Sequence, residues 1–118
     1  MSGTVRIDGN NLVFEIHGID TILSMRRTIS VPLAHVTSVS TDKVPWHPFQ
    51  QLKVAGTSLP GIIKDGTFLS NDGFLFFEMH DTNKCITVSL DHERFKKIIF
   101  EIEDKEKAAK TIQDALSK

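Results

Sequence analysis

Residues 85–118 read CITVSLDHERFKKIIFEIEDKEKAAKTIQDALSK, and this stretch contains two strand patterns followed by a helix pattern. In the second strand pattern Ile98, Phe100 and Ile102 alternate with other residues, and such alternation buries one face of a strand. Asp104 is a good N-cap, and apolar residues recur after it at three- and four-residue spacings. The stretch therefore predicts two strands followed by a helix over about residues 105–117.

The residues before this stretch carry more short strand patterns separated by turns rich in Gly, Asn, Asp and Pro. Pro32 removes a backbone donor, so it predicts that the strand over residues 27–33 ends there or lies at an edge. We expect about seven strands within residues 4–103. A twisted sheet of that size tends to close or fold over itself, and an apolar helix can cover its open end. The sequence predicts one mainly β domain over residues 1–118, an antiparallel barrel or orthogonal sandwich capped by a C-terminal α-helix.

Composition argues against several classes of protein. The 118 residues suit one domain, and 14 basic against 15 acidic residues lack the basic excess typical of nucleic-acid-binding domains. One cysteine cannot form an internal disulfide, and the polar first residues do not resemble a secretory signal. No apolar run approaches the roughly 20 residues of a membrane helix. We expect a cytoplasmic protein.

The exposed face of the terminal helix carries little charge for binding a membrane. Lys107, Lys110 and Lys118 oppose Asp114, which leaves a local charge of about +2. At about 1 kcal/mol per basic residue near an anionic surface, this charge is too weak for stable membrane anchoring. The sequence predicts a solubilising face.

The sequence shows no catalytic or cofactor signature. It has neither a Gly-x-Ser-x-Gly elbow nor a phosphate-binding loop that ends in Gly-Lys-Ser/Thr. Cys85 lies on the polar face of its predicted strand and is interpreted as a structural thiol. The spacing of Gly56, Gly61 and Gly66 does not suit a phosphate cradle, so we expect bends at the first two and a turn at Gly66. We predict no catalytic residue and no cofactor.

Two pairs of residues have the chemistry of metal ligands. Glu15 and His17 lie two residues apart on one strand face, and so do Glu78 and His80. The four side chains could converge on a zinc-like ion if the two strands were neighbours, which the sequence does not show. Because polar residues on the outer face of a strand are ordinarily solvated, we favour that interpretation and predict no metal site.

Aromatic residues on the second face of a strand and in a loop are the sequence feature that most favours a binding partner. In the predicted strand over residues 74–80, Phe74 and Phe76 lie opposite another apolar face, and Trp46 and Phe49 lie in a proline-rich loop. Either the chain itself or another molecule covers these side chains, and both alternatives remain open. If a partner covers them, we expect a homo-oligomer or a protein complex with these aromatic residues at the contact.

Three stretches carry a family resemblance. They are ISVPLAHVTSV at residues 29–39, GTSLPG at residues 56–61 continuing to Gly66-Thr67-Phe68, and the pattern from Cys85 into the closing helix. Together they span nearly the whole chain and resemble the pleckstrin-homology-like (PH-like) fold, more narrowly the small bacterial PH-domain proteins. The resemblance implies a fold, but it implies neither an enzymatic activity nor a ligand.

One departure from the family concerns lipid headgroups. Phosphoinositide-binding PH domains use basic residues around their first hairpin, whereas residues 8–11 read DGNN and Arg6 is the only basic residue nearby. Arg26 and Arg27 are adjacent, so on a strand they point to opposite faces. The sequence does not favour phosphoinositide binding, and Arg26 and Arg27 are instead added to the predicted partner contacts. The leading interpretation is a non-catalytic module that binds itself or another protein; the alternative is a small-molecule or lipid carrier.

Overall fold

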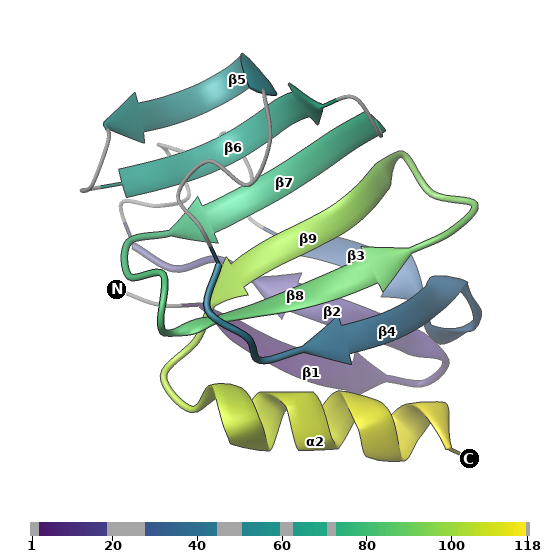
Figure 1. Ribbon diagram of the computed structural model, residues 1–118. Helices are drawn as coiled ribbons and strands as arrows, with labels where there is room; N and C mark the ends of the chain where they lie inside the picture. Colours follow the sequence, from purple (N-terminus) through teal and green to yellow (C-terminus); the bar gives the residue numbers. More distant parts are fainter. Residues whose placement is uncertain (1–2, 19–27, 45–50, 60–62, 71–72, 118) are drawn as a thin grey trace.

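The computed structural model describes residues 3–18, 28–44, 51–59, 63–70 and 73–117 (Figure 1). Within these ranges nine strands precede a C-terminal helix, α2 (Lys105–Leu116), and a short 3-10 helix, η1 (Leu33–His35), joins β3 to β4. The mainly β fold with a terminal helix is thus confirmed, with more strands than the seven expected. The nine strands are β1 (Thr4–Asp8), β2 (Asn11–Glu15), β3 (Thr28–Pro32), β4 (Val36–Ser40), β5 (Gln51–Leu59), β6 (Ile63–Ser70), β7 (Gly73–Met79), β8 (Cys85–Leu90) and β9 (Phe95–Glu101).

None of the helices in the described ranges is long and apolar enough to cross a membrane.

The strands form two sheets. The smaller sheet has the order β1-β2-β3, and the larger has the order β4-β8-β9-β7-β6-β5. An isolated bridge between Gly3 and Ile102 links them at one corner. Within the described ranges the two sheets do not close into one barrel, so the arrangement is an open sandwich.

The pairing of β7 with β9 is parallel, unlike the other strand pairs of the described sheets. The chain leaves β7, forms β8 two positions away in the sheet, and returns as β9 in an antiparallel hairpin with β8. Because β9 thereby enters the gap between β8 and β7, it runs in the direction of β7. The prediction that all strands pair in an antiparallel way is therefore wrong for β7 and β9.

The main core lies between the two sheets and α2. Phe14 of the smaller sheet and Phe100 of the larger sheet pack edge to face, with ring centres 5.2 Å apart. Both side chains are fully buried, which removes large aromatic surfaces from water. The buried residues of the main core are Leu12, Phe14, Ile16, Ile29, Val31, Val36, Phe76, Ile86, Val88, Leu90, Phe95, Ile98, Phe100, Ile102, Ala108 and Ile112.

Helix α2 covers the side of the sandwich between β1 and β4 (Figure 1). Its start is fixed by Asp104, whose carboxylate accepts a hydrogen bond of 3.1 Å from the backbone N–H of Lys107. Ala108 and Ile112 then enter the main core, and Ile112 is fully buried. The terminal helix therefore covers the opening between the two sheets, as its apolar stripe predicts.

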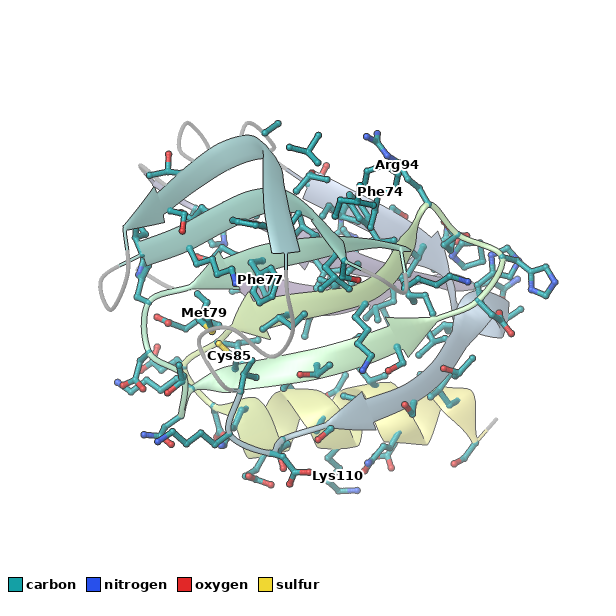
Figure 2. All side chains as sticks on the ribbon, turned by 45° about the horizontal axis from the view of Figure 1, so that its top comes forward. Phe74, Phe77, Met79, Cys85, Arg94 and Lys110 are labelled. Atoms are coloured by element: carbon teal, nitrogen blue, oxygen red, sulfur yellow. The ribbon has the colours of Figure 1, made fainter. Side chains whose placement is uncertain are left out.

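A second core covers the opposite face of the larger sheet. Phe77, Met79 and Cys85 lie on this face, which Figure 2 turns toward the viewer. Since Phe76 enters the main core and Phe77 the second core, both faces of β7 are buried, and β9 is buried on both faces in the same way. The second core consists of Val44, Phe68, Leu75, Phe77, Met79, Cys85 and Ile99.

Replacing Ile112 with alanine is expected to lower the free energy of unfolding by about 2–4 kcal/mol, because the lost methylene groups leave a cavity between the sheets. Gln113→Ala, on the exposed face of the same helix, is the matched control and should change it by less than about 0.5 kcal/mol. Urea denaturation followed by circular dichroism measures both values. Equal effects of the two substitutions would show that α2 does not support the core.

Candidate functional site

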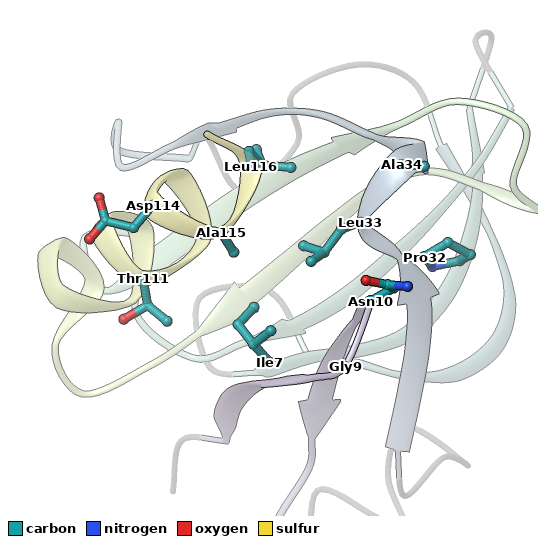
Figure 3. Close-up of a pocket in the computed structure, with 10 residues that line it drawn as sticks. All are labelled: Ile7, Gly9, Asn10, Pro32, Leu33, Ala34, Thr111, Asp114, Ala115 and Leu116. Atoms are coloured by element: carbon teal, nitrogen blue, oxygen red, sulfur yellow. The ribbon is translucent and has the colours of Figure 1, made fainter. Parts of the chain in front are cut away.

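A groove of about 720 Å³ lies between the C-terminal half of α2, the turn between β1 and β2, and η1 (Figure 3). A smaller hollow of about 210 Å³ shares Thr111 with this groove and lies along the N-terminal half of α2. The helical residues of both hollows recur at three- and four-residue spacings, so the two hollows lie along one side of the helix. The groove is lined by Ile7, Gly9, Asn10, Pro32, Leu33, Ala34, Thr111, Asp114, Ala115 and Leu116.

The floor of the groove is apolar and its rim is polar. Ile7, Leu33 and Leu116 are partly buried and pack against the main core. Asn10 and Asp114 are exposed at the rim. In Figure 3 the side chains of Ile7 and Leu33 point into the space beside α2. Such a site can remove an apolar side chain from water while polar groups at the rim fix its orientation.

Local backbone chemistry forms the wall of the groove opposite α2. Pro32 ends β3, as predicted, and the chain turns into η1. The backbone N–H of Leu33 donates to the carbonyl oxygen of Asn10 at 2.8 Å, which ties η1 to the turn between β1 and β2. Gly9 in that turn has φ of 60°, a conformation that favours glycine. The backbone of the β1–β2 turn and of η1 therefore fixes this wall of the groove.

The C-terminal end of α2 gives the groove a negative end. The last turn of the helix has no basic residue to offset the partial negative charge of its terminal carbonyls. Asp114 lies there as well, with its carboxylate 3.0 Å from the ammonium group of Lys110 on the exposed side of the helix. A ligand with an apolar group and a neighbouring positive charge would match this end of the groove.

The six residues predicted to contact a partner lie in different environments, and four of them are outside the described residues. Phe76 is fully buried in the main core, so the chain itself covers it and the prediction of a surface contact at Phe76 is corrected. Phe74 is partly buried against the same core, and the guanidinium of Arg94 lies 5.4 Å from its ring centre (Figure 2). The other four predicted contacts lie outside the described residues: Arg26, Arg27, Trp46 and Phe49.

The two predicted carboxylate–imidazole pairs do not meet. Glu15 bonds to the guanidinium of Arg6 at 3.2 Å, and His17 lies 3.1 Å from the hydroxyl of Thr4, both within the smaller sheet. Glu78 lies near the end of β7 in the larger sheet, and His80 follows directly after this strand. The solvated interpretation therefore suits Glu15 and His17.

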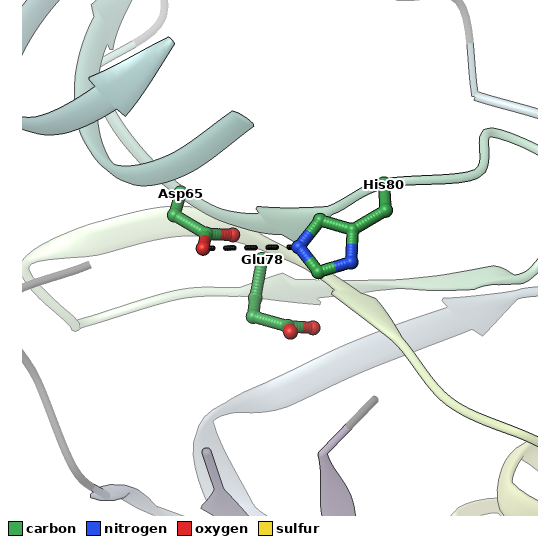
Figure 4. A group of neighbouring side chains, drawn as sticks. All are labelled: Asp65, Glu78 and His80. Carbon is green, nitrogen blue, oxygen red and sulfur yellow. Dashed lines mark ion pairs between the residues drawn. The ribbon is translucent and has the colours of Figure 1, made fainter. Parts of the chain in front are cut away.

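Glu78 and His80 instead lie beside a third residue, Asp65 of β6 (Figure 4). We call these three residues the carboxylate–histidine cluster. One ligand atom from each lies within 4.8 Å of the others, and the imidazole Nε2 is 3.9 Å from a carboxylate oxygen of Asp65. Asp65 and Glu78 are fully buried, whereas the His80 side chain is 23% exposed. The solvated interpretation is wrong for Glu78.

Sequence patterns did not identify Asp65 or the groove. The pair Asp65-Gly66 resembles a turn, but Gly66 lies in the middle of β6 opposite Gly56 of β5. A Cβ atom at Gly66 would lie 2.1 Å from the carbonyl oxygen of Ala55, so the two strands approach as closely as only glycine allows. Two glycines ten residues apart within strand patterns are a signal of this pairing, whereas nothing local signals the groove.

Two titratable side chains are buried near the second core. Burial lowers the pKa of Lys64 to about 8, and the ammonium nitrogen lies 4.1 Å from the ring centre of Phe77. Burial, followed by the nearby charge of Glu101, raises the pKa of the Cys85 thiol. A buried thiol that holds its proton is a poor nucleophile, which agrees with the structural role predicted for Cys85.

The low pKa of Lys64 predicts a change of stability with pH. Between about pH 8 and pH 10.5 the folded lysine is neutral while the unfolded lysine still binds a proton, so Lys64 contributes more stability as pH rises. Cys85 acts oppositely above about pH 9, because only the unfolded thiol ionises there. We therefore compare the wild type with Lys64→Met at pH 7 and pH 10, both variants retaining Cys85.

The unfolding free energy of the wild type minus that of Lys64→Met should rise by about 2 kcal/mol between these pH values. Urea denaturation at each pH measures it. The same difference at pH 7 and pH 10 would show that Lys64 keeps its ordinary pKa in the folded protein.

No protein-family model, curated protein or solved structure matches this chain. The resemblance to PH-like proteins consequently stays a prediction from the sequence. The groove and the carboxylate–histidine cluster are therefore the features from which a function can be inferred.

Proposed function

We propose that this chain is a non-catalytic binding module of the PH-like class, and that its groove beside α2 binds a short segment of a protein chain. The observation that carries the proposal is the apolar floor of Ile7, Leu33 and Leu116 inside a polar rim. Among the residues that the structure describes, the groove lining offers one ionisable side chain, Asp114, and no thiol, imidazole or amine. This composition suits binding better than catalysis. One cysteine, buried and protonated, supports a cytoplasmic location.

The dimensions of the site support an extended polypeptide as the occupant. Helix α2 has 12 residues, which correspond to about 18 Å at 1.5 Å per residue. An extended segment of five or six residues has about the same length. The larger groove and the smaller hollow meet at Thr111, so a segment that runs along the helix can place apolar side chains in both. A basic residue near the end of α2 would add charge complementarity.

A small-molecule or lipid carrier is the second candidate. The groove volume of about 720 Å³ falls within the roughly 300–1,000 Å³ of drug-sized ligand sites. The groove is partly open and continues along the helix, which favours a chain segment over a ligand that is enclosed on all sides. Native mass spectrometry of the purified protein separates the two candidates, because a carrier would retain a co-purified ligand of defined mass.

The proposal predicts that filling the groove abolishes binding. Peptides selected from a random display library against the folded protein should contain large apolar residues next to Lys or Arg. Ala34→Trp places an indole at the exposed wall of the groove and should weaken their binding at least tenfold. Gln113→Trp, on the exposed face of α2 outside the groove lining, is the matched control and should leave the affinity unchanged. Isothermal titration calorimetry measures both affinities.

Chemical-shift mapping and sedimentation complete the test. Bound peptide should shift the amide signals of Ile7, Leu33 and Ala115. If the occupant is a second copy of this chain, the wild type should sediment as an oligomer at tens of micromolar and Ala34→Trp as a monomer. Equal peptide binding by Ala34→Trp and Gln113→Trp would refute the groove as the binding site.

A further inference from the structure

The geometry points to a further site, separate from the groove: Asp65, Glu78 and His80 form a binding site for a divalent transition-metal ion of the Zn²⁺ type. This inference is independent of the proposed function, because no residue of the carboxylate–histidine cluster lines the groove. Two carboxylates and one imidazole are a donor set that such ions accept. Three protein ligands also leave a position for water at a tetrahedral ion.

The spacing of the donor atoms suits one shared ion. Ligand atoms bound to the same tetrahedral zinc ion lie about 3.3–3.6 Å apart, given bonds of about 2.0–2.2 Å. The three donors of the carboxylate–histidine cluster lie within 4.8 Å of one another. Side-chain rotations that shorten the longest separation by about one ångström would bring the three donors to bonding distance.

The strands fix these donors on one face of the sheet. Asp65 and Glu78 are direct partners in the register between β6 and β7, so their side chains project on the same side. His80 comes two residues after Glu78, immediately after β7 ends. The close approach of Gly56 and Gly66 holds the β6 backbone next to Asp65. The donor positions are thus set by the ladder and by a glycine pair, which rigid strands can maintain without a ligand.

Charge gives a reason for a cation at this place. Asp65 and Glu78 are both fully buried, and Glu101 adds a third carboxylate next to His80. Placing carboxylates together away from water is costly unless positive charge accompanies them. A divalent ion bound between Asp65 and Glu78 would bring positive charge to these buried carboxylates.

Glu101 lies beside the imidazole of His80, at the ring nitrogen other than the one nearest Asp65. One oxygen of its carboxylate accepts hydrogen bonds from the backbone N–H groups of His80 at 2.7 Å and Asp81 at 2.6 Å. The other oxygen lies 3.8 Å from Nδ1 of His80, while Nε2 points toward Asp65. A carboxylate behind the imidazole of a metal ligand is a recurrent arrangement, because it fixes the ring and the tautomer. We assign Glu101 the role of a positioning residue.

Partial exposure of His80 gives an ion access from solvent. The two carboxylates are closed off, whereas 23% of the imidazole side chain remains exposed. The imidazole would thus be the first ligand that an entering ion meets. The buried carboxylates would then complete the site.

The experiment measures Zn²⁺ binding to the chelator-treated full chain by competition with a chromophoric chelator and by metal analysis after desalting. The wild type should bind one Zn²⁺ per chain. Asp65→Asn and His80→Gln should each weaken binding at least tenfold, and Glu101→Gln should weaken it about tenfold or more while keeping the ratio of one. The double variant Glu15→Gln/His17→Gln changes the same residue types at the same spacing in the smaller sheet and should bind as the wild type does.

Folding of each variant is checked by circular dichroism and thermal unfolding, with Glu78→Gln as a replacement if Asp65→Asn does not fold. Zn²⁺ should raise the melting temperature of the wild type and of the Glu15→Gln/His17→Gln control, but not that of His80→Gln. Absence of binding by the folded wild type would overturn the inference. Binding that survives both Asp65→Asn and His80→Gln would overturn it as well.

Discussion

β7 and β9 lie side by side in the middle of the larger sheet, and apolar side chains are buried on both faces of each strand. One face of these central strands contributes Phe76, Ile98 and Phe100 to the main core, and the other contributes Phe77 and Ile99 to the second core. Strands that are covered on both sides cannot keep their polar residues in water. Glu78 of β7 is buried for this reason, and Asp65 of β6 is buried beside it as its direct partner in the register. A metal ion is one way to accommodate such carboxylates.

Helix α2 completes this arrangement and also creates the groove. Ile112 packs into the main core. Thr111 and Ala115 line the groove, where the helix faces both η1 and the β1–β2 turn. One side of the helix therefore supports the main core, and the adjacent side forms a wall of the groove. Because Leu33 and Ile7 are shared by the core and the groove floor, a ligand in the groove would contact residues that already pack against the fold.

Local chemistry explains which features could be predicted from the sequence. Asp104 and the apolar spacing after it predict the end of the helix to within one residue, and Pro32 predicts the end of β3. Caps, periodicity and a missing N–H act within a few residues, so the local sequence contains this information.

Features that depend on pairing between distant segments could not be predicted in this way. Gly66 was interpreted as a turn because its partner Gly56 lies on another strand. Phe95 and Ile98 both lie in the main core although strict alternation along β9 would put them on opposite faces, because the register between β7 and β9 shifts beside Phe95. The groove combines three segments far apart in the chain, and no local pattern encodes their meeting.

Native-state hydrogen exchange measured residue by residue tests the burial of both faces of β7 and β9 most directly. Strands buried on both faces should open only when the whole domain unfolds. We expect the amides of Phe77 in β7 and Ile99 in β9 to exchange with a free energy equal to that of global unfolding. Amides of the edge strand β1, such as that of Ile7, should exchange at a lower free energy. Amides of β7 and β9 that exchange as readily as those of β1 would contradict the account.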